Sequence, residues 1–231
     1  GDDITVINYV TMQNYVKGIL PYEMSSSWPF EALKAQALCA KSYAMCCIGK
    51  HGSSGFDLCN TTCCQVYRGT ALANSSTDKA VDDTYGMYVM YNDSIAQTFY
   101  HSSDGGYTED VKNVWGSDIG YLKAIKDIYE SHDSSYSYTY TFDDITWILQ
   151  NKGYSYGTIV DSYVSAFTPA GNVLTVCFVD SNGKPHYFSR EAARNILYSS
   201  TLGKYARSQR FTISPSISLF VDKNMQFSRD L

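Results

Sequence analysis

The sequence predicts one α+β body over residues 1–231, with a central Ala/Cys-rich helix, β-hairpins and a C-terminal mixed α/β part. Three observations lead to this prediction. Helical and hairpin patterns are mixed without the strand–helix–strand rhythm of a parallel sheet, and no internal repeat is visible. Apolar residues make up 44% of the chain, which is enough to bury a core. Residues 1–140 and 141–231 are candidate subdomains within this body.

The chain begins with a predicted strand and a short helix. Apolar and polar residues alternate over Ile4–Tyr9, which is typical of a half-buried strand. Thr11 can cap a helix over Met12–Ile19, because its hydroxyl can accept a bond from a free N–H of the first turn. Pro21 ends that helix, since the residue before a proline avoids the helical region.

The clearest helix runs from Pro29 to about Ile48. Pro29 suits the first helical position, and Ser27 or Trp28 can cap it. The centre of this segment is rich in alanine and cysteine. Small side chains allow close approach of neighbouring elements, so we expect this helix at the centre of the fold.

The remaining elements follow from turn residues and alternation. Asn92-Asp93 lies between two alternating runs and is a hairpin signal, and Asn182-Gly183 marks another turn. The predicted elements, in chain order, are a helix Thr77–Tyr85, strands Met87–Tyr91 and Ser94–Tyr100, a helix from a cap at Asp143 or Asp144 to Gly153, strands Thr158–Phe167, Val173–Val179 and Pro185–Phe188, and a helix Glu191–Tyr198 capped by Ser189.

Charge and hydropathy exclude two classes of partner. The formal net charge is −5, and no basic stripe is present that would displace counterions, so we expect no nucleic-acid binding. The longest apolar run, Tyr43 to Ile48, is about six residues, whereas a membrane-spanning helix needs about 20. We therefore expect no membrane segment in this chain.

Seven cysteines are present, an odd number that does not form a complete set of disulfides. Four are expected to be core thiols, because free cysteines are usually buried: Cys39, Cys46, Cys47 and Cys177. The other three, Cys59, Cys63 and Cys64, lie with His51 within 14 residues. Thiolates and an imidazole suit tetrahedral zinc, and a Cys59–Cys64 disulfide is the competing interpretation. We expect the adjacent Cys63 and Cys64 to bind one ion together only with strain.

Glutamates are scarce, with only five in the chain. Two of them fall in the first turns of predicted helices, and Glu109 lies in a loop that we expect to be solvated. Glu23 differs because it lies between Tyr22 and Met24. Apolar neighbours would desolvate its carboxyl and raise the pKa toward the value that a general acid needs. A solvent-facing turn glutamate is the alternative interpretation.

Several motifs occur in a fixed order along the chain. They are Val16–Met24 (VKGILPYEM), Trp28-Pro29, Glu31–Ala37 (EALKAQA), Gly55–Gly69 (GFDLCNTTCCQVYRG), Ser102–Thr108 (SSDGGYT), Val114–Gly116 (VWG) and Tyr121–Lys123 (YLK). Together they resemble the stage II sporulation protein D family of peptidoglycan lytic transglycosylases, whose relatives include amidase enhancers. The resemblance extends over about residues 4–213.

The resemblance implies a single catalytic domain and a catalytic residue. Glu23 corresponds to the glutamate of the family's Pro-x-Glu-Met motif. The implied reaction cleaves the β-1,4 bond between N-acetylmuramic acid and N-acetylglucosamine and forms a 1,6-anhydro ring. Because the attacking hydroxyl belongs to the substrate, one acid/base residue suffices where ordinary glycosidases need two.

The resemblance also implies a substrate groove around Glu23. Lys34 matches a lysine of the family, while Lys41 and Glu130 stand where arginine and aspartate are usual. Lys34 and Lys41 are seven residues apart, so we expect them on one side of the long helix. The remaining expected substrate-binding residues are Ser102, Ser103, Thr108, Tyr121 and Lys123.

The resemblance finally favours structural zinc on His51, Cys59 and Cys64, with Cys63 as an alternative ligand and no zinc needed for catalysis. It implies peptidoglycan glycan strands as the substrate and an extracytoplasmic location, with an anchor outside this chain. The alternative function is a non-catalytic peptidoglycan-binding module that stimulates a cell-wall amidase. A cysteine peptidase is a third class, and it would need Cys59 or Cys63 paired with His51.

Overall fold

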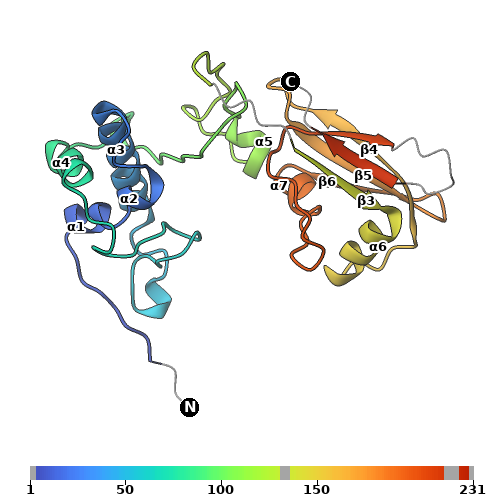
Figure 1. Ribbon diagram of the computed structural model, residues 1–231, viewed down its shortest axis with the longest axis horizontal. Helices are drawn as coiled ribbons and strands as arrows, with labels where there is room; N and C mark the ends of the chain where they lie inside the picture. Colours follow the sequence, from blue (N-terminus) through green and yellow to red (C-terminus); the bar gives the residue numbers. More distant parts are fainter. Residues whose placement is uncertain (1–3, 131–135, 216–223, 229–231) are drawn as a thin grey trace. The chain divides into compact units, whose positions relative to one another are not determined.

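The computed structural model describes residues 4–130, 136–215 and 224–228 (Figure 1). The chain divides into two compact units, Gly1–His101 and Ser102–Leu231. Each unit has its own elements and its own buried cluster, and each is described by itself below. Helices and small antiparallel sheets are both present, so the predicted α+β class is confirmed. The prediction of one domain with subdomains 1–140 and 141–231 stays a prediction.

The first unit is mainly helical. Its described elements are α1 (Met12–Lys17), α2 (Leu20–Glu23), α3 (Phe30–Cys47), the 3₁₀ turn η1 (Gly52–Ser54), α4 (Ser75–Asp83) and the short hairpin β1 (Met90–Tyr91) and β2 (Ser94–Ile95). Helix α3 packs against α1, α2 and α4, which gives it the central position predicted from its small residues. The buried cluster consists of Val16, Ile19, Leu20, Leu33, Ala37, Ala40, Ala80 and Val81.

Glycine and proline explain why two short helices replace one at the start of the chain. Gly18 ends α1, and its backbone N–H donates to carbonyls of the last turn. Pro21 then lies in the first turn of α2, where a missing N–H costs nothing. A Cβ at Gly18 would come within 2.4 Å of the Tyr67 ring, so only glycine lets the segment after the cysteines pack here. Arg68 N–H also donates to the Gly18 carbonyl.

The second unit is built on antiparallel strands. The first sheet has the order β4 (Ile159–Phe167), β5 (Val173–Asp180), β6 (Pro185–Ser189), and the second has the order β3 (Ser137–Thr141), β8 (Asn224–Ser228), β7 (Thr212–Pro215). Helix α6 (Phe142–Asn151) packs against β3 and β4, and α7 (Glu191–Asn195) packs against β5 and β6 (Figure 1). The remaining helix described in this unit is α5 (Val111–Trp115). Large side chains, among them Tyr140, Phe178 and Phe188, fill the core.

Several local predictions were wrong at the ends of elements. Residues 4–9 form no strand, because alternation alone supplies no partner strand for them. Helix α3 has Pro29 as its N-cap and no side-chain cap bond. The N-cap of helix α6 is Thr141 and not Asp143 or Asp144, because Thr141 forms a capping box with Asp144. Helix α7 ends at Asn195 and not at the predicted Tyr198. Its N-cap is Arg190, at φ 60°, and not the predicted Ser189.

Two cysteine predictions also differ from the structure. Cys47 and Cys177 are buried as predicted, and Cys39 is half-buried. Cys46 was expected in the core but is exposed, and its thiol donates to the Ile95 carbonyl at 3.4 Å. It lies on the side of α3 toward the short β1–β2 hairpin, which is too small to cover it.

Candidate functional site

Glu23 is the last residue of helix α2. Its side chain is exposed on one side, and no hydrogen bond or ion pair engages its carboxylate in the part of the chain that the structure describes. Neighbouring atoms exclude water from part of the carboxyl group, and this desolvation raises its pKa above the ordinary value. A carboxyl group that is available and retains its proton more readily has the properties of a general acid.

Tyr100 lies close enough to Glu23 for their charges to interact, and Gln65 hydrogen-bonds Tyr100. Burial is the main cause that raises the pKa of Tyr100 to about 12, and the charge of Glu23 adds to it. Gln65 Nε2 donates to the Tyr100 hydroxyl and to the Ala40 carbonyl, both at 3.1 Å. Gln65 is therefore the link between the Glu23 surroundings and the central helix. Sequence reasoning missed this role, although Gln65 lies in one of the motifs quoted above.

Lys34 is partly exposed and bound to a neighbour on its own helix. Its ammonium lies 2.8 Å from the Glu31 carboxylate and 5.7 Å from the centroid of the Phe30 ring. Exposed ion pairs of this kind are weak and exchange readily with other anions. Lys34 can therefore offer its charge to a ligand without disturbing the fold.

Lys41 is different, because only 1% of it is exposed. Its Nζ donates to the Thr84 carbonyl at 2.5 Å, and burial lowers its pKa. It lies about 10 Å along the helix from Lys34, where the end of α4 covers it. The predicted contact with substrate has no exposed cation to support it, so the structure gives Lys41 the role of joining α3 to α4.

The other expected substrate-binding residues lie in the second unit. Ser103 Oγ donates to Glu130 at 2.8 Å, and the Asp104 N–H donates to the same oxygen at 3.1 Å. Thr108 Oγ1 donates to the Lys123 carbonyl at 3.0 Å. The structure thus pairs Ser103 with Glu130 and Thr108 with Lys123. Ser102 is exposed and Tyr121 is half-buried.

Lys123 is held by two aspartates. Its ammonium contacts the Asp118 carboxylate and lies 3.2 Å from Asp110. The Asp118 contact is the main cause that raises the pKa of Lys123. The hydrogen bond from the Lys112 N–H is the main cause that lowers the pKa of Asp110. These contacts fix the conformation of the segment that carries Thr108 and Lys123.

Glu109 has a structural role that the sequence did not indicate. We expected it in a solvated loop, but its carboxylate accepts bonds from Asn113 (2.8 Å), Thr168 (2.7 Å) and Asn172 (2.8 Å). Thr168 and Asn172 belong to the turn between β4 and β5. Glu109 therefore fastens the segment before α5 to this hairpin and is not available as an acid.

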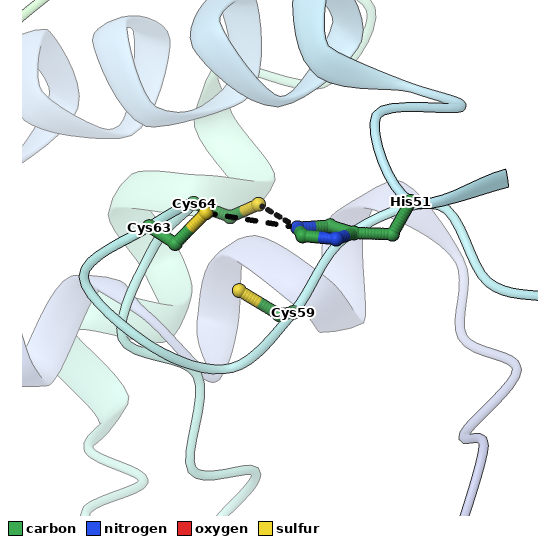
Figure 2. Close-up of side chains that lie close together, drawn as sticks. All are labelled: His51, Cys59, Cys63 and Cys64. Carbon is green, nitrogen blue, oxygen red and sulfur yellow. Dashed lines mark hydrogen bonds between the residues drawn. The ribbon is translucent and has the colours of Figure 1, made fainter. Parts of the chain in front are cut away.

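The predicted cysteine cluster comes together around His51 (Figure 2). His51 Nε2 lies 3.3 Å from Cys64 Sγ and 3.8 Å from Cys63 Sγ. The possible ligand atoms of these residues and Cys59 all lie within 4.8 Å of one another. The seven cysteines are free thiols in the structure, so the cluster is not drawn together by a disulfide.

The turn that carries the cysteines explains why two adjacent residues take part. Cys64 N–H donates to the Thr61 carbonyl at 3.1 Å, and Thr61 Oγ1 accepts from the Cys63 N–H at 3.2 Å. This turn directs both side chains toward His51 (Figure 2), although we expected these adjacent residues to bind one ion together only with strain. Thr61 also hydrogen-bonds Cys59 and is the main cause that lowers the pKa of that thiol to about 6.

The cluster fits the donor set of a structural zinc site. Three sulfurs and one imidazole nitrogen are common zinc ligands, and a tetrahedral ion would separate them by roughly 3.5–3.8 Å. The distance from His51 Nε2 to Cys63 Sγ, 3.8 Å, lies at the upper end of this range, and the distance to Cys64 Sγ, 3.3 Å, lies slightly below it. His51 also stacks on Phe56 at 5.2 Å between centroids, which holds the imidazole in place.

Comparison with known proteins assigns the first unit to a family. Residues 1–91 match the profile described as Stage II sporulation protein, and this stretch contains both Glu23 and the cysteine cluster. The matched part of the chain, residues 1–91, is therefore a domain of the stage II sporulation protein D family. In a stage II sporulation protein D domain of this kind, Glu23 and the cluster lie in the same matched region.

Three relatives show how far the likeness extends. An uncharacterized protein of Brachyspira hyodysenteriae is 42% identical over 125 residues, which cover 54% of this chain and 34% of that protein. The amidase enhancer of Bacillus subtilis is 46% identical over 112 residues, or 48% of this chain and 15% of the enhancer. Stage II sporulation protein D of Bacillus subtilis is 29% identical over 152 residues, or 59% and 44%. The chain spans less than half the length of each of these relatives.

Across residues 4–130, 136–215 and 224–228, no helix is long and apolar enough to cross a membrane.

Proposed function

We propose that this chain is a lytic transglycosylase that cleaves the β-1,4 bond between N-acetylmuramic acid and N-acetylglucosamine in peptidoglycan glycan strands. The observation that carries the proposal is the Glu23 carboxyl, which has a raised pKa and no engaged partner among the described residues. Its place in the Pro-x-Glu-Met motif of a stage II sporulation protein D domain supports the same role.

The proposed mechanism uses Glu23 twice. Its carboxyl group first donates a proton to the glycosidic oxygen as the bond to C1 of muramic acid breaks. Its carboxylate then accepts the proton of the C6 hydroxyl on the same sugar, whose oxygen attacks C1 and closes the 1,6-anhydro ring. No water is consumed, and Glu23 ends with the proton that it had at the start.

Digestion of purified glycan strands tests this proposal. Mass spectrometry should find products with 1,6-anhydro ends, and Glu23→Gln should reduce their rate of formation by about 10²- to 10⁴-fold, the usual contribution of a general acid. Glu191→Gln is the matched control, because Glu191 is an exposed glutamate of the second unit. Hydrated ends in place of anhydro ends, or full activity of Glu23→Gln, would rule the proposal out.

The alternative is a non-catalytic peptidoglycan-binding module that stimulates a cell-wall amidase. The 46% identity to a protein named amidase enhancer favours it. In this case Glu23→Gln would still increase the rate of a purified cell-wall amidase, whereas no strand cutting would be seen with the unmodified chain. The same variant therefore separates the two functions.

In the first unit, we propose that Lys34 contributes its exchangeable charge to substrate binding. The candidates for substrate binding in the second unit are Ser102, Ser103, Thr108, Tyr121, Lys123 and Glu130. Because peptidoglycan lies outside the cytoplasm, we propose that the protein is extracytoplasmic. We do not propose Lys41 as a substrate-binding residue, because its side chain is buried.

We further propose that His51, Cys59, Cys63 and Cys64 hold a structural zinc ion. When bound, zinc would cross-link the two ends of the loop that begins at His51 and ends before Gln65, and so help to hold Gln65, the hydrogen-bond partner of Tyr100, in place. Elemental analysis should find about one zinc per chain, and Cys59→Ser should lower both the zinc content and the unfolding temperature. Cys46→Ser is the control, since Cys46 is an exposed thiol outside the cluster.

Two results would contradict this zinc proposal. A Cys59–Cys64 disulfide would be seen as two fewer reactive thiols in the unfolded chain and no bound metal. Loss of strand cutting on removal of zinc, with an unchanged fold, would show that the ion is not merely structural.

A further inference from the structure

A cavity of about 430 Å³ lies in the second unit, beside the C-terminal ends of helices α6 and α7. Its lining residues are Lys152, Arg194, Asn195, Tyr198, Tyr205, Ala206 and Arg207. None of these residues has a role in the proposed reaction or in the cysteine cluster. Three cations meet here although the whole chain has a net charge of −5.

The three cations of this cavity are not neutralised by carboxylates in the described ranges of the chain. Arg207 Nη2 donates to the Tyr205 hydroxyl at 3.0 Å, and Arg194 Nη2 donates to the Asn195 side-chain carbonyl at 3.3 Å. Both acceptors are neutral. Since a guanidinium has five N–H donors, each arginine retains donors for a further acceptor. The concentrated positive charge therefore favours an anion.

Two tyrosine rings, those of Tyr198 and Tyr205, also line the cavity. Tyr198 is 52% exposed, and its ring centroid lies 6.2 Å from that of Tyr205. Lys152 Nζ lies 6.0 Å from the Tyr198 ring, and Arg207 Cζ lies 5.1 Å from the Tyr205 ring. The Tyr205 ring also packs against the Tyr138 ring, with 5.5 Å between their centroids. The cavity thus has an exposed, positioned aromatic face next to its cations.

We propose that this cavity binds a saccharide that carries an acidic group, with the carboxylate or phosphate on Arg194, Arg207 and Lys152 and the sugar ring against Tyr198. Its volume is in the range of small-ligand sites. Arginines bind both kinds of acid through paired N–H donors, and a tyrosine ring offers an apolar face and a hydroxyl. The anion follows from the charges alone, whereas the saccharide rests on the proposed function.

Calorimetric titration of the full chain tests the proposal with four probes. N-acetylmuramic acid carries a carboxylate and glucose 6-phosphate carries a phosphate, so the pair shows which acid the cavity prefers. N-acetylglucosamine is the neutral sugar, and inorganic phosphate is the anion without a sugar. At least one charged sugar should bind roughly tenfold or more tightly than the neutral sugar and than phosphate.

Variants assign the binding to this cavity. Arg194→Gln and Arg207→Gln should each weaken binding of the charged sugar roughly tenfold or more, and Tyr198→Ser should remove its advantage over phosphate. Lys184→Gln is the matched control, because Lys184 is an exposed cation in the turn between β5 and β6. Circular dichroism checks the fold of each variant. If either glutamine variant fails to fold, the lysine variant of the same arginine replaces it, and this change should still weaken binding because the paired donors are lost.

Some results would overturn the proposal. These are no binding of either charged sugar, equal binding of the neutral sugar, or unchanged affinity in both arginine variants. Equal affinity for phosphate and the charged sugars, unaffected by Tyr198→Ser, would remove the saccharide and with it the proposal. Glu23→Gln should bind the charged sugar normally, so failure of the proposed reaction and failure of this site are separate results.

Discussion

The two compact units bury different kinds of side chain. In the described part of the first unit, the buried apolar residues are aliphatic or cysteine, and buried polar residues such as Lys41, Gln65 and Thr84 lie among them. The second unit buries Tyr140 and Phe178 in a larger cluster beneath its sheets. Both units also bury polar side chains, so the difference lies in their apolar cores: aliphatic packing around α3 in the first unit and aromatic packing in the second. The predictions below test this difference.

The largest expected effect comes from opening the aromatic core. Phe178 is fully buried on β5, so Phe178→Ala should lower the free energy of unfolding by about 3–5 kcal/mol. Urea denaturation followed by NMR signals of β5 measures this change. Signals of α3 serve as the internal control for the first unit. A loss below about 1 kcal/mol would mean that the cluster does not stabilise the sheet as its burial indicates.

The next effect concerns the buried lysine. Lys41→Ala should cost about 2–4 kcal/mol, because it leaves a cavity between α3 and α4. Lys41→Met keeps most of the volume, and the Thr84 carbonyl still accepts from the Met87 N–H. We therefore expect Lys41→Met to be folded and close to the unmodified chain in stability.

Lys41→Met also tests the role that the family resemblance implied. If Lys41 is structural, glycan binding and cutting by Lys41→Met should be unchanged. Strand cutting and a sedimentation assay with peptidoglycan measure this. Loss of binding in a variant of normal stability would show that Lys41 contacts the substrate. Lys41 would then have to become exposed when the substrate binds.

Local sequence signals predicted the elements that depend on neighbours in the chain. The Ala-rich run gave α3 to within one residue at each end, and Asn92-Asp93 gave the turn of the β1–β2 hairpin, where both residues have positive φ. Strand β3 was missed because it reads as a polar Ser/Tyr-rich segment and pairs with β8, far along the chain. Its partner, and not its composition, makes it a strand.

The same distinction applies to the candidate site. The Pro-x-Glu-Met motif indicated Glu23 as the candidate acid. The close spacing of His51 and three cysteines in the sequence predicted that they would cluster. The burial of Lys41 could not be predicted, because it depends on where the end of α4 packs on α3. The joint approach of Cys63 and Cys64 depends on a single turn at Thr61. Tertiary contacts and turn geometry are the information that a single sequence lacks.

The smallest effect is a difference in pH dependence between the units. Burial lowers the pKa of Lys41, so the folded first unit binds fewer protons than the unfolded chain just below the ordinary pKa of lysine. Its stability should therefore rise with pH in that window. In the second unit, the hydrogen bond from His186 is the main cause that lowers the pKa of Asp180, and N–H donors of Lys184 and Asn182 add to it. This stabilisation is present above the ordinary carboxyl pKa and is lost as pH falls through the lowered value.

Urea denaturation over a range of pH, read from NMR signals of α3 and β5, measures both slopes. Lys41→Met should flatten the alkaline slope seen by α3 and leave the acid slope of β5 unchanged. Asp180→Asn should do the reverse, because it removes the carboxylate that His186 binds at 2.9 Å. If one variant changed both slopes, the two buried ionisable groups would not act independently. The contrast between the aliphatic core of the first unit and the aromatic core of the second would then not extend to their electrostatics.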